Sequence, residues 1–269
     1  MGSEVSFKSG AIFVVKYGGH AMDDDALNKK FAANVAELIK LGAKVVVVHG
    51  GGPHISGMLK KLDVPSEFKN GLRVTDEATM QVVEMMLAGT VNKSVVNLFQ
   101  QNGVNAAGFC GKDGYTIVAK KLDGDVDYGF VGEVTKVDIK LVKVLLDAGF
   151  VPVIAPVGVG EDGTTYNINA DTSAGAVAGA LQADCFVLVT DVPGVLDENK
   201  KLLESLTRSE IMTMIETGAI SGGMIPKVES CLFALDKGVK RALIMDGREE
   251  NNLLLSLTEQ GGIHTFVEN

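Results

Sequence analysis

The feature that most constrains the fold of this chain is a run of four valines followed, one residue later, by three glycines. Residues 45–48 are all β-branched and apolar, which predicts a fully buried strand, because the run is too short for a helix. Residues 50–52 are all glycine, and Pro53 fits the first turn of a helix, where its missing N–H costs nothing. A tight turn needs only one glycine. Three of them between a strand and a helix instead indicate that backbone amides at the helix N-terminus bind an anion.

A second glycine turn follows another apolar run. Residues 11–15 predict a buried strand, and Lys16, a tyrosine and two glycines come directly after it. Between the two strands, apolar residues recur at helical spacing. The acidic residues 23–25 suit the start of this helix, and Gly42 suits its end. We therefore expect residues 11–52 to form a β-α-β unit with parallel strands and a right-handed crossover.

The rest of the chain continues this alternation, which is typical of an α/β fold with a mainly parallel sheet. Further strands and helices are expected as follows: strands at residues 151–156, 185–191 and 240–246, and helices at residues 53–62, 76–101, 138–149, 174–181, 208–217 and 251–260. Short apolar runs between residues 104 and 135 predict antiparallel strands. Residues 158–169 predict a hairpin, and residues 262–267 can close an edge of the sheet.

Three charged residues stand out from this framework. Lys227 follows a glycine pair and a proline in the first turn of a predicted helix, where a cation opposes the helix dipole; such a local conflict favours a functional role. Asp171 precedes an alanine-rich helix and could simply cap it, or it could accept hydrogen bonds from Lys16 and Lys227. Arg73 could bind a carboxylate through its fork, although its spacing alone favours a solvent-facing loop charge.

Composition excludes several classes of function. A net charge of −9, few aromatic residues and no tryptophan disfavour binding to nucleic acid or to anionic membranes. The three cysteines lie far apart, without metal-ligand spacing, and are expected to be core residues. No apolar run reaches membrane-spanning length and no signal peptide is recognisable, so a cytoplasmic protein is expected. The glycines of residues 158–163 match a dinucleotide fingerprint, but a strand rather than a helix follows them, which disfavours a dehydrogenase.

Six motifs, in this order, resemble those of the amino acid kinase family. They are Lys16-Tyr-Gly-Gly, His49-Gly-Gly-Gly-Pro, Gly71-Leu-Arg-Val-Thr-Asp, Asn167-Ile-Asn-Ala-Asp, Thr190-Asp-Val-Pro-Gly-Val-Leu and Gly222-Gly-Met-Ile-Pro-Lys. The match extends over almost the whole chain. The motif that begins at Gly71 is the most diagnostic, and it is typical of the members that act on N-acetyl-L-glutamate.

The resemblance implies a three-layer αβα open sandwich in two lobes. Residues 1–181 would form the N-terminal lobe, for acyl amino acid binding and dimerisation, and residues 182–269 the C-terminal lobe, for ATP binding. The implied reaction transfers the γ-phosphoryl group of ATP to the side-chain carboxylate of N-acetyl-L-glutamate in arginine biosynthesis. Mg²⁺ would bridge the phosphates and keep mostly water and phosphate ligands, so no protein metal site is expected.

The same resemblance assigns roles to individual residues. Lys16 and Lys227 would stabilise the transition state, and Asp171 would organise the two lysines. The acyl amino acid would be bound by Gly51, Gly52, Arg73 and Asn167. The transferring phosphoryl group and the nucleotide would contact Gly18, Gly19, Thr190, Asp191, Gly194, Val195, Leu196 and Met224.

Two rival functions remain open from the sequence. One is a kinase for a homologous acid, such as N-acetyl-aminoadipate or a carrier-linked glutamate, because one methylene is worth only about 1–3 kcal/mol of discrimination. The other is a non-catalytic metabolite sensor, which the presence of both lysines and Asp171 disfavours. The resemblance implies that hexameric relatives link their dimers through an N-terminal helix, and the polar segment before the first strand is short for such a helix, so a homodimer joined through residues 80–101 is expected rather than a hexamer. Residues 257–265 loosely resemble an arginine-binding region, so feedback control stays open.

Overall fold

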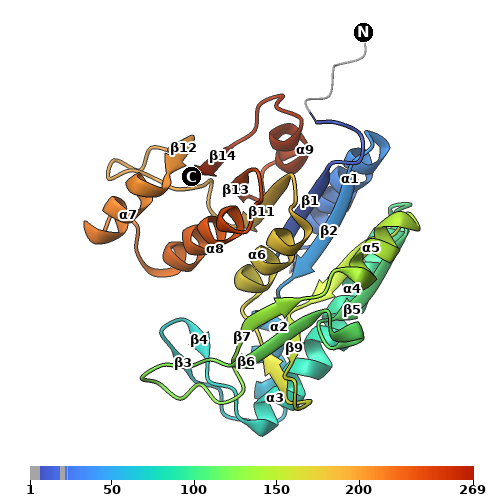
Figure 1. Ribbon diagram of the computed structural model, residues 1–269, viewed down its shortest axis with the longest axis vertical. Helices are drawn as coiled ribbons and strands as arrows, with labels where there is room; N and C mark the ends of the chain where they lie inside the picture. The colour runs from blue at the N-terminus through green and yellow to red at the C-terminus, as the bar shows by residue number, and fades with distance from the viewer. Residues whose placement is uncertain (1–6, 19–21, 23) are drawn as a thin grey trace.

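The computed structural model describes residues 7–18, 22 and 24–269, and its central element is an eight-stranded sheet (Figure 1). The strands follow the order β12-β14-β13-β11-β1-β2-β8-β5. Every neighbouring pair is parallel except β13 and β14, which confirms the mainly parallel sheet. The strands are β1 (Ile12–Tyr17), β2 (Lys44–His49), β5 (Ala106–Cys110), β8 (Val151–Ala155), β11 (Cys185–Thr190), β12 (Ser205–Thr207), β13 (Ala242–Asp246) and β14 (His264–Glu268).

Helices cover both faces of this sheet, which confirms the three-layer αβα sandwich. They are α1 (Asp25–Lys40), α2 (Gly52–Lys61), α3 (Glu77–Glu84), α4 (Asn92–Gln101), α5 (Lys140–Asp147), α6 (Ala170–Leu181), α7 (Arg208–Glu216), α8 (Ile225–Asp236) and α9 (Asn252–Leu257). On one face α1, α4 and α9 pack in a single apolar cluster, and on the other face α5, α6 and α8 do so.

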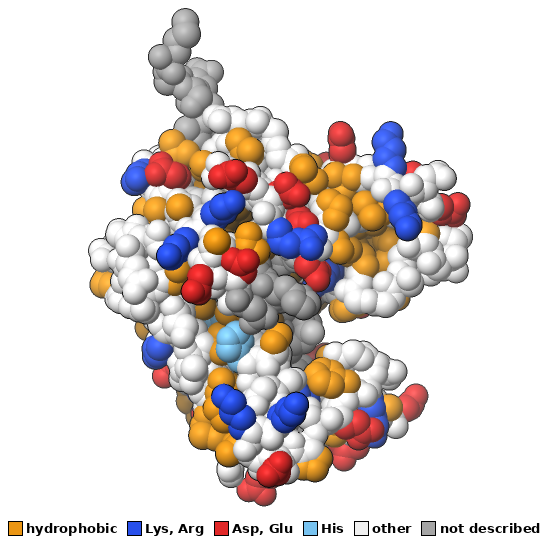
Figure 2. All heavy atoms as spheres, turned by 180° about the vertical axis from the view of Figure 1, so that it is seen from behind, with side chains coloured by type: hydrophobic (Ala, Val, Ile, Leu, Met, Phe, Trp, Pro, Cys, Tyr) orange, Lys and Arg blue, Asp and Glu red, His pale blue; other side chains and the backbone are white. Residues whose placement is uncertain are grey.

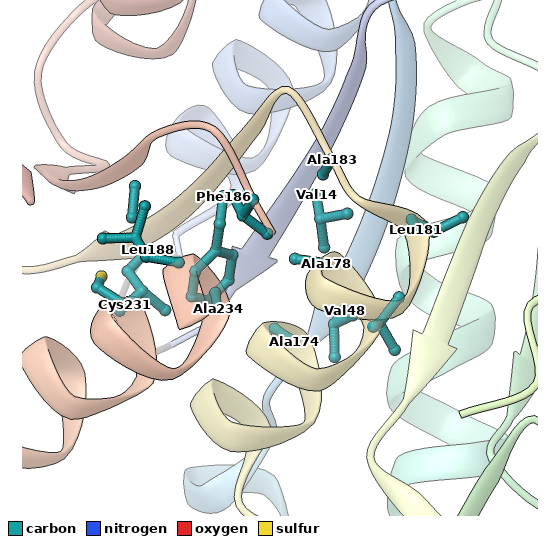
Figure 3. Packing of buried hydrophobic residues seen from close by; sticks show 14 of the residues in the cluster. Val14, Val48, Ala174, Ala178, Leu181, Ala183, Phe186, Leu188, Cys231 and Ala234 are labelled. Carbon is teal, nitrogen blue, oxygen red and sulfur yellow. The ribbon is translucent and has the colours of Figure 1, made fainter. Parts of the chain in front are cut away.

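Successive side chains along each strand point to opposite faces of the sheet, so the apolar core is divided between the two faces. Val14 and Val48 point toward α6 and α8, whereas Val15 and Val47 point toward α1. Figure 3 shows Val14 and Val48 beside the small side chains of α6, and Phe186 beside α8. The small residues of α6 let that helix lie close to the sheet, which fixes the position of its N-terminus. All three cysteines are buried and free, as expected of core residues.

The interpretation of the segment after residue 104 was partly wrong. The first of its runs, β5, is not antiparallel but joins the edge of the main sheet parallel to β8. A four-stranded sheet of order β10-β9-β6-β7 holds the rest, with β6 (Ile117–Lys121) and β7 (Gly132–Val137) antiparallel. The expected hairpin is confirmed as β9 (Val157–Val159) and β10 (Thr165–Asn167). A short apolar run carries no information on its partner strand, which explains the error.

The far edge of the main sheet also differs from the prediction. The C-terminal strand β14 does not close the sheet, because β12 pairs with its outer side. With only three residues, β12 is too short to give a periodic pattern in the sequence.

The predicted helix 76–101 is continuous but not uniform. Asp76 caps it, accepting the N–H of Thr79 at 2.8 Å, and a π-helical segment, η2 (Met85–Val91), separates α3 from α4. Met80 and Met86 are buried, and Met85 is 57% exposed. Met85 is therefore the one of these three that another subunit could contact, and the subunit contact along residues 80–101 stays a prediction.

A recess on one side divides the surface into an upper and a lower mass (Figure 2). Because β1, β2 and β11 are parallel, their C-terminal ends lie at the same edge of the sheet, where α/β proteins bind ligands. Within the described ranges, every helix is too short or too polar to serve as a transmembrane segment.

Candidate active site

Two lysines meet on one carboxylate at the carboxyl edge of the sheet. Lys16 comes from the end of β1, Asp171 from the first turn of α6 and Lys227 from the first turn of α8. The Nζ of Lys16 lies 3.0 Å from Oδ1 of Asp171, and the Nζ of Lys227 lies 3.0 Å from Oδ2. The structure therefore brings together the three residues predicted to be catalytic, although they lie far apart in the sequence.

The charges of this trio do not cancel. Burial alone raises the pKa of the Asp171 carboxyl, but the two ammonium groups outweigh burial, and the pKa is lowered. Asp171 is therefore ionised at neutral pH, and one negative charge faces two positive charges. The remaining positive charge suits an anionic ligand such as a phosphoryl group.

Asp171 is free to hold the lysines because it does not cap its helix. The side chain of Asn169 caps α6, accepting the N–H groups of Asp171 at 2.8 Å and Thr172 at 3.1 Å. The alternative of Asp171 as N-cap is therefore wrong. The helix also begins earlier than residue 174, at Ala170. The ion pair with Asp171 offsets the unfavourable position of Lys227 near the N-terminus of α8.

The two glycine turns lie against each other beside Lys16. The N–H of Gly50 donates to the carbonyl of Tyr17 at 2.7 Å, which joins the turns at the ends of β1 and β2. A Cβ atom on Gly18 would lie 3.0 Å from the Nζ of Lys16 and 3.4 Å from the Cα of Gly50. Gly18 thus leaves the room that the lysine needs to fold back over the turn. Gly19, the other predicted phosphoryl contact, lies outside the described residues.

Arg73 is buried, so the interpretation as a solvent-facing charge is wrong. It lies on β4 (Leu72–Arg73), paired with β3 (Phe68–Lys69) across a turn at Asn70 and Gly71. The guanidinium donates to the carbonyl of Gly52 at 3.1 Å and to the hydroxyls of Ser56, at 2.8 Å, and Ser66. Its Cζ lies 4.5 Å from the centre of the Phe68 ring, and burial lowers its pKa.

No acidic side chain in the described part of the chain forms an ion pair with Arg73. A buried cation with neutral partners alone is unfavourable unless an anionic ligand completes the site. The planar fork of arginine can bind both oxygens of a carboxylate. Arg73 is therefore a candidate receptor for a carboxylate group.

One cavity of about 300 Å³ joins these features. It is lined by Lys16, Gly51, Gly52, Arg73 and Asn167, among others, so all four residues predicted to bind the acyl amino acid lie around it. The side-chain amide of Asn167 donates to the hydroxyl of Thr75 at 3.1 Å, which holds it in the wall. The apolar side of the cavity includes Leu87, Val131 and Ile168. Sequence reasoning missed these three residues, because an apolar wall has no motif.

The first two residues predicted to bind nucleotide, Thr190 and Asp191, lie at the end of β11 beside the end of β13. Thr190 ends β11, and the carbonyl of the next residue, Asp191, accepts a hydrogen bond from Arg248 at 2.5 Å. Arg248 also forms an ion pair with the buried Asp246 at 2.7 Å. This arginine, which sequence reasoning missed, ties β13 to the loop after β11.

The loop that contains Gly194, Val195 and Leu196 packs against β14. The N–H of Val195 donates to the hydroxyl of Thr265 at 2.8 Å, and a side chain on Gly194 would collide with Thr265. Because the Val195 side chain is buried, this residue offers a ligand only its backbone. The backbone of Leu196 forms an isolated antiparallel β-bridge with that of Leu202. Met224 lies in a short 3₁₀ turn, η4 (Gly222–Met224), before Lys227. Nucleotide binding by these residues stays a prediction.

Comparison with known proteins decides the family. The family model described as "Amino acid kinase family" matches residues 11–246. The chain belongs to the amino acid kinase family. Curated relatives of this kinase are named acetylglutamate kinase. This chain is 52% identical over 270 residues to the acetylglutamate kinase from Granulibacter bethesdensis, and the match covers 96% of this chain and 91% of that relative. It is 54% identical over 268 residues to the one from Solidesulfovibrio magneticus, covering 96% and 90%.

Solved structures agree with this placement of the kinase. N-acetylglutamate synthase from Neisseria gonorrhoeae, complexed with coenzyme A and N-acetyl-glutamate, matches with a TM-score of 0.85 at 25% identity. The match covers 97% of this chain but only 60% of the synthase. Carbamate kinase from Giardia lamblia bound to AMP-PNP matches with a TM-score of 0.68 at 20% identity, covering 96% of this chain and 99% of that chain. The likeness to carbamate kinase shows a shared fold.

Proposed function

We propose that this kinase transfers the γ-phosphoryl group of ATP to the side-chain carboxylate of N-acetyl-L-glutamate, giving N-acetyl-L-glutamyl 5-phosphate in the second step of arginine biosynthesis. The relatives named acetylglutamate kinase support this reaction. In the structure, the proposal rests on Arg73, a buried cation that shares a cavity with Lys16 and has no acidic partner in the described ranges. A substrate with one carboxylate to anchor and a second to phosphorylate suits such a cavity.

The proposed chemistry needs charge stabilisation more than proton transfer. An oxygen of the substrate's side-chain carboxylate attacks the γ-phosphorus in line with the β–γ bridging oxygen. The new O–P bond forms as the bridging P–O bond breaks, and that electron pair leaves with ADP. Lys16 and Lys227 stabilise charge on the equatorial oxygens, while Asp171 holds both ammonium groups in place. No covalent enzyme intermediate is required.

The two halves of the chain are proposed to divide the substrates. Residues 1–181 bind the acyl amino acid through Gly51, Gly52, Arg73 and Asn167. Residues 182–269 bind ATP through Thr190, Asp191, Gly194, Val195, Leu196 and Met224. Gly18 and Gly19 are proposed to contact the transferring phosphoryl group.

Mg²⁺ fits this proposal as a partner of the phosphates rather than of the protein. It would neutralise part of the phosphate charge while bound to phosphate oxygens and water. The described residues offer no cluster of three or more His, Cys, Asp or Glu side chains for a metal ion. What the site does offer is ammonium and amide groups, which suit the anionic phosphate oxygens.

We further propose that the enzyme is a cytoplasmic homodimer with its contact along residues 80–101, which include η2 and α4. The exposed Met85 on η2 supports an apolar contact there. Light scattering at the mass of a monomer or a hexamer would contradict the dimer.

Trapping the acyl phosphate with hydroxylamine tests the reaction directly. The purified kinase is given ATP and Mg²⁺ with N-acetylglutamate, N-acetyl-aminoadipate or free glutamate in parallel. A hydroxamate with N-acetylglutamate alone is expected. A stronger signal with N-acetyl-aminoadipate would keep the mechanism and change the substrate, while ATP binding without any hydroxamate would favour a sensor.

A further inference from the structure

A fully buried polar pair lies beneath the glycine turn of the cavity, and the chemistry above does not use it. His49 ends β2 and Asn92 begins α4, and both side chains are 0% exposed. The Nδ1 of His49 lies 2.7 Å from the carbonyl oxygen of Gly50, and its Nε2 lies 3.1 Å from the Nδ2 of Asn92. In the sequence, His49 stands out only as part of the motif that begins with it.

The contacts of Asn92 determine which way its amide points. Its Nδ2 lies 3.0 Å from the carbonyl of Val153, which can only accept a hydrogen bond. Its Oδ1 accepts a hydrogen bond from the ammonium of Lys93 at 2.9 Å. The Nδ2 group of Asn92 therefore faces the imidazole as a donor.

The protonation state of His49 follows from these neighbours. Since the Gly50 carbonyl can only accept, the proton must lie on Nδ1, and since the Asn92 amide donates, Nε2 must be bare. Burial lowers the pKa of His49 to about 4, so the ring is neutral at pH 7. His49 is thus held in the neutral Nδ1–H tautomer.

This hydrogen bond sets the orientation of the peptide that joins Gly50 and Gly51. In a trans peptide, the C=O and N–H groups point in opposite directions. With the Gly50 carbonyl drawn toward the imidazole, the N–H of Gly51 points away from it. In the described ranges no protein acceptor receives this N–H, and Gly51 borders the cavity that holds Lys16 and Arg73.

We propose that His49 and Asn92 are positioning residues that hold the Gly50–Gly51 peptide so that the Gly51 N–H donates to the anionic substrate. The inference rests on the proposed function, because it takes the carboxylate substrate as the acceptor. Neither side chain lines the cavity, so both act only through the backbone. The surroundings fit this arrangement: a Cβ atom on Gly108 would overlap Asn92, so that glycine leaves the space that the amide occupies.

The first test measures the tautomer in the wild-type protein and needs no variant. Nitrogen-15 NMR of the imidazole is expected to show a protonated Nδ1 and a bare Nε2 for His49 at pH 7. A proton on Nε2 would overturn the inference, because the ring could not then donate to the Gly50 carbonyl.

The second test separates positioning from general stability. Asn92→Leu removes the donor to His49 at similar volume, and is expected to raise the KM for N-acetylglutamate about tenfold, the value of one hydrogen bond. The KM for ATP should stay within about twofold, because the nucleotide residues lie elsewhere. Asn34→Leu is the matched control: Asn34 is also a buried amide, and it binds the backbone of Leu254 and Lys30, away from the cavity.

His49→Asn provides a second variant that keeps a donor near the Gly50 carbonyl. It should raise the KM for N-acetylglutamate less than His49→Phe, which removes the donor. Equal effects of the two variants, or equal rises in both KM values for Asn92→Leu, would refute a positioning role. A wild-type enzyme that makes no acyl phosphate would instead refute the proposed function and leave the tautomer result standing.

Discussion

Mild acid is expected to destabilise this kinase through the single imidazole of His49. Burial of the ring is the main cause that lowers its pKa from 6.5 to about 4. The charges of Lys93 and His54 also lower the pKa, and the hydrogen bond to Gly50 opposes this shift only in part. In the unfolded chain the imidazole regains the ordinary value. At a pH between these two pKa values, the His49 imidazole is protonated in the unfolded state and neutral in the folded state. The stabilisation is therefore complete above pH 6.5 and is lost as the pH falls from 6.5 toward 4.

The size of the effect follows from the gap between the two values. Each pH unit within the gap changes the free energy of unfolding by about 1.4 kcal/mol. At pH 5 the loss is about 2 kcal/mol, and near pH 4 it approaches about 3 kcal/mol. Solvent does not screen this change in the free energy of unfolding, because His49 is 0% exposed.

Urea denaturation of the wild type and of His49→Asn, each at pH 7.5 and pH 5, isolates this contribution. Comparing the change with pH in the two proteins cancels the other histidines and most carboxylates. The wild type should lose about 2 kcal/mol more than the variant on going to pH 5. Equal losses in the two proteins would refute the reasoning, since His49 would then titrate alike in the folded and unfolded states.

Substitutions at four further residues test the site. Lys227→Ala should lower kcat by about 100-fold or more with a smaller change in KM, because its charge acts mainly in the transition state; initial-rate kinetics that show an unchanged kcat would remove the lysine from the mechanism. Arg73→Ala should raise the KM for N-acetylglutamate about 10- to 100-fold and leave the KM for ATP nearly unchanged, and Arg73→Lys should restore little of the loss; calorimetric titration with N-acetylglutamate checks both variants. Gly18→Ala should lower kcat about tenfold, because its methyl group would reach the ammonium of Lys16; the same kcat as the wild type would mean that the lysine moves at no cost. Arg248→Ala should raise the KM for ATP severalfold by releasing the loop at Asp191, and a changed KM for N-acetylglutamate instead would contradict that role.

The sequence by itself determined the elements that depend on local pattern. The apolar run at residues 11–15 and the four valines at residues 45–48 form buried strands, and the glycines after the valines lead into the N-terminus of α2. Asp76, the first residue of the predicted helix 76–101, caps that helix, and a cap depends only on residues within one turn. The motifs also indicated the family, which the family model confirmed.

The tertiary structure alone decided which groups meet and which are buried. Arg73 resembles a loop charge in the sequence, but the walls formed by α2 and the β3–β4 hairpin remove it from water. Whether Asp171 caps a helix or joins two lysines depended on Asn169 and on the distant Lys227. The pairing of His49 with Asn92 has no local signal either, because it needs β2 and α4 side by side. Local patterns set the conformation of the backbone, whereas burial and charge pairing are set by distant residues, which no local pattern records.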